Sequence, residues 1–201
     1  MRAASFTALC LTTLCAALFA CSPAERPYAE EIAARRAQTD DFMRTSDRSP
    51  VPPDQRRTFP PLSYFPVNEA YRVPAALQVA RGEDTMEMST STGTRRAMRR
   101  IGTLQFSLQG QPLTLTAFAE ASDSTLATLF VPFGDPTNKR ETYRAGRYLD
   151  LDRTATGLYD LDFNRAYHPY CLFNTSYECP IPPRENHLSI PILAGERLPQ
   201  P

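Results

Sequence analysis

Short segments in which apolar and polar residues alternate constrain the fold of this chain more than any other feature. Leu104–Leu108, Leu113–Ala117 and Tyr159–Phe163 all alternate with a period of two, as expected for strands that bury one face. No helical pattern separates these segments. The expected strands are 86–89, 103–108, 113–117, 127–133, 147–152, 158–164 and 188–192. About seven short strands in succession predict an antiparallel β-barrel or sandwich.

Proline adds two details to this mainly β prediction. The segment Pro50–Pro66 contains six of the 19 prolines, so we expect an extended, semi-rigid wrap around the domain. Residues 24–46 are the best helix candidate, because Tyr28, Ile32 and Met43 fall near one face. The apolar stripe is weak, so this N-terminal helix packs on the domain or serves as a solvated spacer.

The first 20 residues have the layout of a signal peptide. Arg2 precedes the uncharged, apolar segment Ala3–Leu18, and Ala20 precedes Cys21. This pattern resembles the signal of bacterial lipoproteins, in which a lipid on the cysteine anchors the mature protein. An ordinary secretory signal or a retained anchor are the alternatives. Ser22, rather than aspartate, favours the outer membrane over inner-membrane retention.

These patterns divide the chain into three parts and predict its location. We expect a lipoprotein signal peptide at 1–20, a helix or spacer at 21–49, and a single β-rich domain at 50–201. We also expect a lipid-anchored protein of the bacterial cell envelope, facing the periplasm.

Charge and motifs exclude several function classes. The chain has 22 basic and 22 acidic side chains, and this balance argues against nucleic acid as a partner. The nucleophile elbow, the Walker loop, the dinucleotide-binding glycine motif and the His-Glu-x-x-His motif are all missing, so we predict no cofactor. The expected partners are a membrane, through the lipid, and a small polar ligand or an envelope protein.

A resemblance to a known family rests on the motifs between residues 141 and 196. These include GRYLDL at 146–151, LDFNRAY at 161–167 and the closing AGE at 194–196, with FPPLSYFP at 59–66 upstream. The chain resembles the bacterial family called domain of unknown function 1684. The resemblance implies no activity and no catalytic residue. His168 stands where we expect asparagine in many members.

The same region is rich in polar residues that could form one site. Candidate binding residues come from two strands and from a proline-stiffened segment that follows them: Arg147, Asp162, Asn164, Arg165, Glu185 and Asn186. Arginine and asparagine can grip a polar ligand through paired hydrogen bonds, and rigid support suits a binding site. We therefore expect these residues to converge.

Two alternatives to ligand binding stay open. Acidic residues around 150–162, together with Glu185, could serve an envelope hydrolase, since neighbouring carboxylates acquire raised pKa values. Ion pairs among the same residues could instead hold the fold, in a purely structural envelope protein. No catalytic residue is assigned.

Cys171 and Cys179 are the only cysteines after Cys21. In an oxidising compartment two such thiols usually join, so a disulfide is the expectation. Free thiols are one alternative. A metal site completed by His168 and His187 is another, but no metal is predicted.

Overall fold

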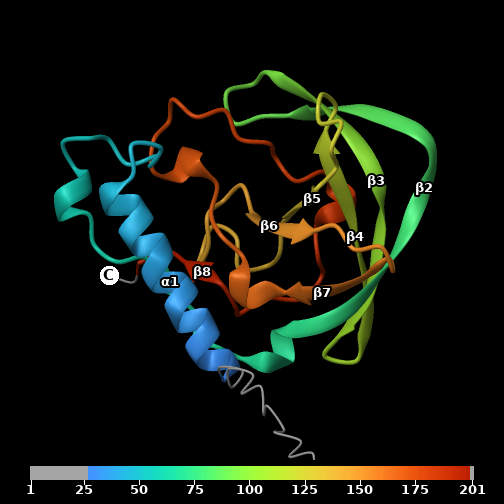
Figure 1. Cartoon of the computed structure of the whole chain (residues 1–201), viewed down its shortest axis with the longest axis horizontal. Coiled ribbons are helices and arrows are strands. Elements are labelled where there is room, and N and C mark those ends of the chain that lie inside the picture. Colours follow the sequence, from blue (N-terminus) through green and yellow to red (C-terminus); the bar gives the residue numbers. More distant parts are fainter. Residues whose placement is uncertain (1–26, 200–201) are drawn as a thin grey trace, which may run out of the picture.

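A computed structural model describes residues 27–199 and gives one α-helix and eight strands in that range (Figure 1). The signal peptide and Cys21 lie outside the described residues. The helix is α1 (Tyr28–Thr45). The strands are β1 (Ser63–Tyr64), β2 (Arg72–Ser89), β3 (Arg95–Leu108), β4 (Gln111–Glu120), β5 (Thr128–Phe133), β6 (Arg147–Asp152), β7 (Leu158–Asp162) and β8 (Glu196–Arg197).

Six strands form one antiparallel sheet in the order β6-β5-β4-β3-β2-β7. The sheet curls into a nearly closed barrel, visible on the right of Figure 1. The long strands β2 and β3 shift register near Gly102, where a Cβ atom would overlap the carbonyl of Gln78. Glycine therefore permits the close approach that bends these two strands. The predicted antiparallel barrel, mainly β with an N-terminal helix, is confirmed.

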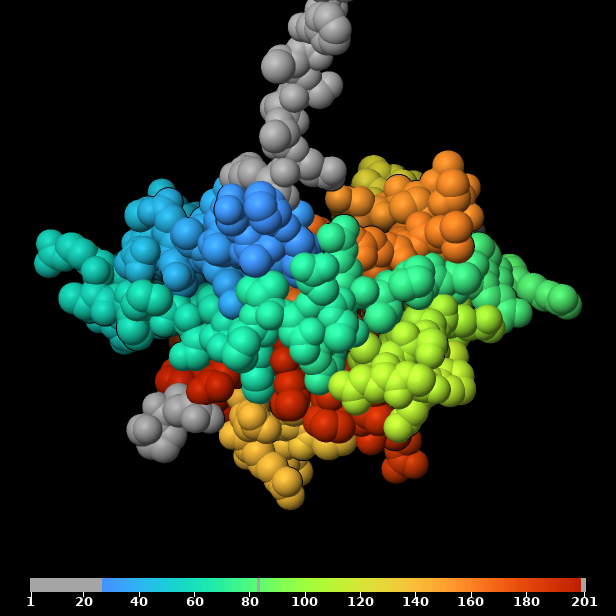
Figure 2. All heavy atoms as spheres, turned by 90° about the horizontal axis from the view of Figure 1, so that it is seen from below, coloured from blue at the N-terminus to red at the C-terminus, as the bar shows by residue number. Residues whose placement is uncertain are grey.

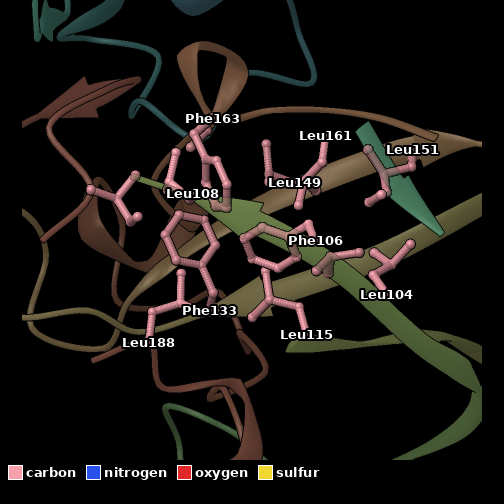
Figure 3. Packing of buried hydrophobic residues seen from close by; sticks show 14 of the residues in the cluster. Leu104, Phe106, Leu108, Leu115, Phe133, Leu149, Leu151, Leu161, Phe163 and Leu188 are labelled. Carbon is pink, nitrogen blue, oxygen red and sulfur yellow. The ribbon is translucent and has the colours of Figure 1, made fainter. Parts of the chain in front are cut away.

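The alternating residues of the strands fill the barrel. Leu104, Leu115 and Phe133 are completely buried, and they meet side chains from β6, β7 and the segment after β7 (Figure 3). Completely burying such side chains stabilises by about 1.5–3 kcal/mol each. The turn between β3 and β4 consists of Gln109 and Gly110, both with positive φ, which is the geometry of a tight hairpin.

The predicted strand at 188–192 is wrong. Leu188, Ile190 and Ile192 are buried as expected, but the segment forms no strand. Pro191 has no amide hydrogen to donate, and the amide of Ile192 donates to Oδ1 of Asp135 at 3.1 Å instead of to a neighbouring strand. The final strand is β8, which pairs with β1.

Helix α1 packs on the domain rather than extending as a spacer. Ile32 and Met43 are buried, and the hydroxyl of Tyr28 donates to Oδ1 of Asp162 at 2.8 Å. The helix begins after Pro27, has acidic residues in its first turn and ends with Arg44 in its last, as the helix dipole favours. Figure 2 shows the blue helix lying against the teal segment that follows it.

The proline-rich segment carries the chain from α1 to the barrel. Val51 and Phe65 are buried along its course, and the amide of Leu62 donates to Oδ1 of Asp40 on the helix at 2.8 Å. The segment therefore ties α1 to the sheet. Within residues 27–199, the structure has no helix of the length and apolar character that a membrane crossing requires.

Candidate functional site

A cleft of about 640 Å³ lies between α1, the outer face of β3 to β6, and the segment 164–180. We call it the helix cleft. Its volume falls within the range of small-molecule sites. In Figure 1, α1 lies apart from the barrel, and the segment that follows β7 runs beside the helix. Tyrosine and phenylalanine side chains reach the cleft from α1, β5, β6 and the segment 164–180.

The aromatic side chains of the floor pack edge to face. Tyr148 lies between Phe130 and Tyr167, with ring centroids 4.7 Å and 5.7 Å away. Tyr170 and Tyr177 form a second such pair at 5.3 Å. Edge-to-face pairs of this kind hold each ring in a fixed orientation. The floor is therefore a rigid surface.

Asp150 projects from β6 into this cleft. Its Oδ2 accepts a hydrogen bond from the hydroxyl of Tyr167 at 2.7 Å. The side chain is accessible, but surrounding protein raises the pKa of Asp150, and this desolvation outweighs the opposing effects of Tyr167 and Arg35. Because Tyr167 occupies only one oxygen, Asp150 can accept a hydrogen bond from a ligand.

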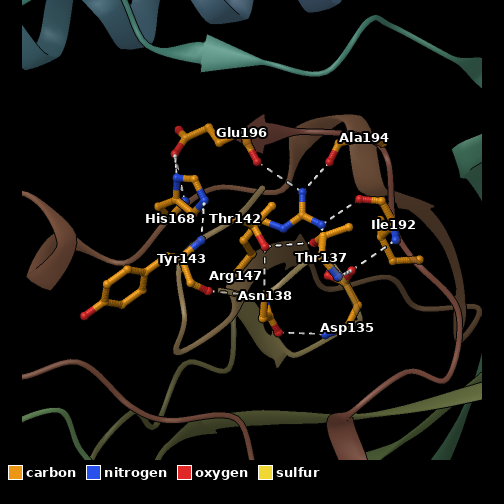
Figure 4. A network of polar contacts seen from close by, with 10 residues as sticks. All are labelled: Asp135, Thr137, Asn138, Thr142, Tyr143, Arg147, His168, Ile192, Ala194 and Glu196. Atoms are coloured by element: carbon orange, nitrogen blue, oxygen red, sulfur yellow. Dashed lines mark hydrogen bonds and ion pairs between the residues drawn. The ribbon is translucent and has the colours of Figure 1, made fainter. Parts of the chain in front are cut away.

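Glu196 is the second carboxyl group that lines the cleft. Only 4% of the residue is exposed, and burial raises the pKa of Glu196 to about 7. Its Oε2 accepts from the amide of His168 at 2.8 Å. No hydrogen bond within residues 27–199 uses Oε1, and Figure 4 shows that oxygen turned away from His168.

His168 is neutral and fixed in one tautomer. Its Nε2 accepts from the amide of Tyr143 at 3.2 Å, so the proton resides on Nδ1, 3.4 Å from Oε2 of Glu196. Burial, followed by the charge of Arg147, lowers the pKa of His168 to about 3. The carbonyl of an asparagine could accept from the same amide, which is consistent with the residue expected at this position.

Four arginines line the cleft, and two of them have carboxylate partners. Arg96 pairs with Glu120 at 3.2 Å, and Arg165 is bound to two carboxylates, as described below. Arg36 stacks over the ring of Tyr64 at 4.4 Å and donates to the carbonyl of Phe65. Arg35 forms no salt bridge within residues 27–199. Two guanidinium groups therefore lack a carboxylate in direct contact.

The six residues predicted to form one site are distributed over several places. Arg147 is completely buried beneath the C-terminal segment (Figure 4). It pairs with Asp135 at 3.0 Å and donates to the carbonyls of Ile192, Ala194 and Glu196. Gly146 precedes it with a φ of 95°, a conformation that favours glycine. Within the described residues, Arg147 therefore clamps the chain and does not face the cleft.

Asn186 and Glu185 are also remote from the cleft. The side chain of Asn186 is fully buried and bonds to the backbone amide and carbonyl of Thr116 and to the carbonyl of Pro132. It holds β4 and β5 in place. Glu185 forms a salt bridge of 3.2 Å with Arg100. Neither residue lines the helix cleft.

Asp162, Asn164 and Arg165 do lie together, beneath the N-terminal end of α1. Oδ1 of Asp162 accepts from the amide and side chain of Asn164. Arg165 pairs with Asp162 at 3.1 Å and with Glu31 of the helix at 2.5 Å. Asn164 and Arg165 line the cleft, but these contacts already use most of their hydrogen-bonding groups. The three residues dock the helix.

The acidic residues considered for a hydrolase do not cluster. β6 and β7 lie at opposite ends of the strand order and form no ladder. Asp160 pairs instead with Arg72 of β2 at 2.7 Å, while Asp150 faces the cleft. Hydrolysis by two carboxyl groups requires them at a defined separation across one site. This distribution gives the hydrolase alternative no geometric support.

The expected disulfide is absent: Cys171 and Cys179 are both free and buried. The amide of Cys171 donates to Sγ of Cys179 at 3.0 Å, so the fold does bring the two residues together. Hydrogen bonding between the thiols lowers the pKa of Cys171 and raises that of Cys179. The prediction of a disulfide assumed an oxidising compartment. The two cysteines lie close together, but they are free thiols in this structure.

The metal alternative likewise gains nothing from the geometry. Among the described residues, no three His, Cys, Asp or Glu side chains are grouped so that they could hold a metal ion. His187 lies against Gly134 and faces the carbonyl of Pro182 at 3.4 Å. His168 is turned to Glu196 and Tyr143.

The sequence and the fold each have a known counterpart. The model of the family described as "Protein of unknown function (DUF1684)" matches residues 57–197. The chain belongs to this family. An uncharacterized protein of Haloarcula marismortui, solved in solution by NMR, has the same fold with a TM-score of 0.66. It is 36% identical, and the match covers 84% of this chain and 93% of that one. No curated protein matches the chain.

The DUF1684 motifs account for much of the geometry just described. Arg147 lies in GRYLDL, Asp162 and Asn164 lie in LDFNRAY, and Glu196 closes AGE. Sequence reasoning quoted these motifs but missed Asp150, Tyr167 and Glu196 as cleft residues. The alternation of β6 does place Tyr148 and Asp150 on one face, and that was the available signal. Arg35 and Arg36 precede the residues that match the family model, and the sequence gave no signal that they line a cleft.

Proposed function

We propose that this DUF1684 protein binds a small polar ligand in the helix cleft, and that it does so at the bacterial cell envelope. The observation that carries the proposal is the accessible carboxylate of Asp150 among the aromatic side chains of a 640 Å³ cleft. Such sites combine apolar walls with a few convergent polar groups. Glu196 supplies a second acceptor in the same cleft.

The architecture supports binding at this place. The floor comes from strands of a rigid barrel, and α1 forms the facing wall through contacts such as Tyr28 to Asp162. Sites built on strands and helices hold their polar groups more exactly than sites on loops. The cleft therefore needs little rearrangement to receive a ligand.

A thermal-shift screen of polar metabolites against the purified protein tests ligand binding. Ligands that stabilise the wild type should lose most of that stabilisation in Asp150→Asn, because the amide weakens the hydrogen bond to the ligand. Asp152→Asn is the matched control, since Asp152 is exposed on the same strand and does not line the cleft. Equal shifts in both variants would place binding elsewhere.

The location rests on the N-terminal sequence. The apolar segment that ends in Leu18-Phe19-Ala20-Cys21 supports lipidation of Cys21, which would anchor the domain to a membrane. We expect Cys21→Ala to move the protein from the membrane fraction to the soluble fraction. If partitioning does not change, the lipid anchor is wrong, while ligand binding by the domain is unaffected.

A further inference from the structure

The charges of the helix cleft define what kind of ligand it can take. Two of its arginines, Arg96 and Arg165, are neutralised by Glu120, Asp162 and Glu31. A ligand would have to displace these ion pairs to use their guanidinium groups. These two arginines therefore have a structural role, and the other charged residues of the cleft are available to contact a ligand.

The charges that remain consist of two guanidinium and two carboxyl groups. Arg35 lies close enough to Asp150, and Arg36 close enough to Glu196, to oppose the rise in the pKa of each carboxyl that burial causes. Neither arginine forms a salt bridge with these carboxyls in the described chain. Guanidinium and carboxyl groups are therefore interspersed in the cleft, where a ligand hydroxyl can donate to a carboxyl group or accept from a guanidinium group.

Two further acidic residues, Asp123 and Glu178, line the cleft. Asp123 accepts from the amide and the hydroxyl of Thr125 and from the amide of Leu126. Glu178 is exposed and accepts from the hydroxyl of Thr90 at 3.3 Å. These carboxylates are engaged by the chain at the edge of the cleft.

The environment of Glu196 supports the binding of a ligand that donates hydrogen bonds. The carboxyl group is buried, and it is surrounded by Arg147 of β6, by His168, by Tyr64 of β1, and by Arg36 and Asp40 of α1. Its Oε1 lines the cleft without a hydrogen bond from residues 27–199. Because Glu196 lines the cleft, this oxygen is free to accept a hydrogen bond from a ligand hydroxyl.

The aromatic walls determine the rest of the ligand. Tyr167, Tyr170 and Tyr177 are only partly buried, and all three line the cleft. Aromatic faces receive flat, apolar surfaces such as the C–H face of a sugar ring, whose hydroxyls project from its edge toward carboxylates and guanidinium groups. We propose that the helix cleft binds an uncharged, hydroxyl-rich ligand with an apolar face, namely a saccharide.

The proposal rests on the proposed function and can be tested separately from it. Isothermal titration calorimetry of the purified protein would compare three neutral probes, maltotriose, cellotriose and chitotriose, with two charged probes, glucuronate and tyramine. We expect at least one trisaccharide to bind more tightly than both charged probes. Asp150→Asn and Glu196→Gln should each weaken that binding by about tenfold, as expected when a hydrogen bond to a charged group is lost.

Each other outcome has a defined meaning. Asp152→Asn should leave the affinity unchanged, because Asp152 does not line the cleft. If tyramine or glucuronate binds in an Asp150-dependent way and no trisaccharide does, the saccharide proposal is overturned and the proposed function stands. If no probe binds while the metabolite screen also finds no Asp150-dependent ligand, both fail.

Discussion

At the scale of single residues, buried polar groups divide into those that hold the chain and those that face the cleft. Arg147 has no exposed surface and donates to three carbonyls of the segment 192–196. Asp150 is accessible, and one of its oxygens lacks a protein donor in the described chain. The contacts of Arg147 leave no room for a ligand. The free oxygen of Asp150, by contrast, needs a ligand or water as a hydrogen-bond donor.

Removing Arg147 should destabilise the fold severely. Arg147→Ala would leave Asp135 as a buried charge without its partner, which typically costs about 3–5 kcal/mol. Arg197→Ala, at a partly exposed position of β8, should cost much less. Urea denaturation measures both. A cost for Arg147→Ala below about 1 kcal/mol would contradict the role of this clamp.

Glu196 should make stability depend on pH. Its pKa rises from 4.5 in the unfolded chain to about 7 in the fold, so the folded state binds the proton more tightly. This contribution is fully present below pH 4.5 and is lost as the pH rises to about 7. The pKa of His168 is lowered to about 3, so its effect has the opposite sign. Its contribution to the stability of the fold is lost as the pH falls from 6.5 to 3.

Comparing Glu196→Gln with the wild type isolates the contribution of Glu196, because His168 is present in both. The difference in unfolding free energy should shift in favour of the variant by at most about 3 kcal/mol between pH 4.5 and 7.5. Glu178→Gln is the control, since Glu178 is exposed. A difference that stays flat across this range would show that Glu196 is not a strained carboxyl.

At the scale of elements, strands β3 to β7 followed at least in part from the sequence, whereas β1, β8 and most of β2 did not. Alternation in β3, β4 and β6 reports directly which face is buried. The segment 188–192 is equally apolar, but its backbone bonds go to Asp135 and Arg147. These partners lie far away in the sequence, so a local pattern cannot reveal them.

The candidate site was harder to predict for the same reason. Polar residues of the C-terminal motifs were predicted to form a binding site, yet Arg147 and Asn186 satisfy backbone groups rather than a ligand. Sequence shows which side chains are polar, but not which carbonyls surround them. The cleft itself depends on α1 docking against Asp162 and Arg165, contacts between segments far apart in the chain.

The docking of α1 depends on its first turn. Glu31 of this turn forms a salt bridge with Arg165 of the domain. Tyr28→Phe should cost about 1–2 kcal/mol, because it removes a donor from the buried Asp162.

Tyr170→Phe is the matched control, since no hydrogen bond within residues 27–199 uses the hydroxyl of Tyr170. Hydrogen exchange of the helix amides should rise in Tyr28→Phe alone. Equal exchange in the two variants would mean that this contact does not hold the wall of the cleft.

At the scale of the whole molecule, a barrel with a filled core carries its candidate site on the outside. The core residues fill the barrel, and the helix cleft lies outside it, where α1 and the segment 164–180 cover the outer face of β5 and β6. A shallower hollow of about 400 Å³ lies between β2 and β7, near Leu158. Its lining includes a single aromatic residue, Tyr159, and the salt bridge between Arg72 and Asp160.

The central claim is that the helix cleft is where this protein meets its ligand. Chemical-shift mapping of the isotope-labelled protein, with the ligand that gives the largest thermal shift, tests it most directly. We predict that the largest changes fall on the amides of Asp150, Tyr167 and His168. Changes confined to the hollow around Arg72 and Leu158, with the cleft amides unmoved, would contradict the account.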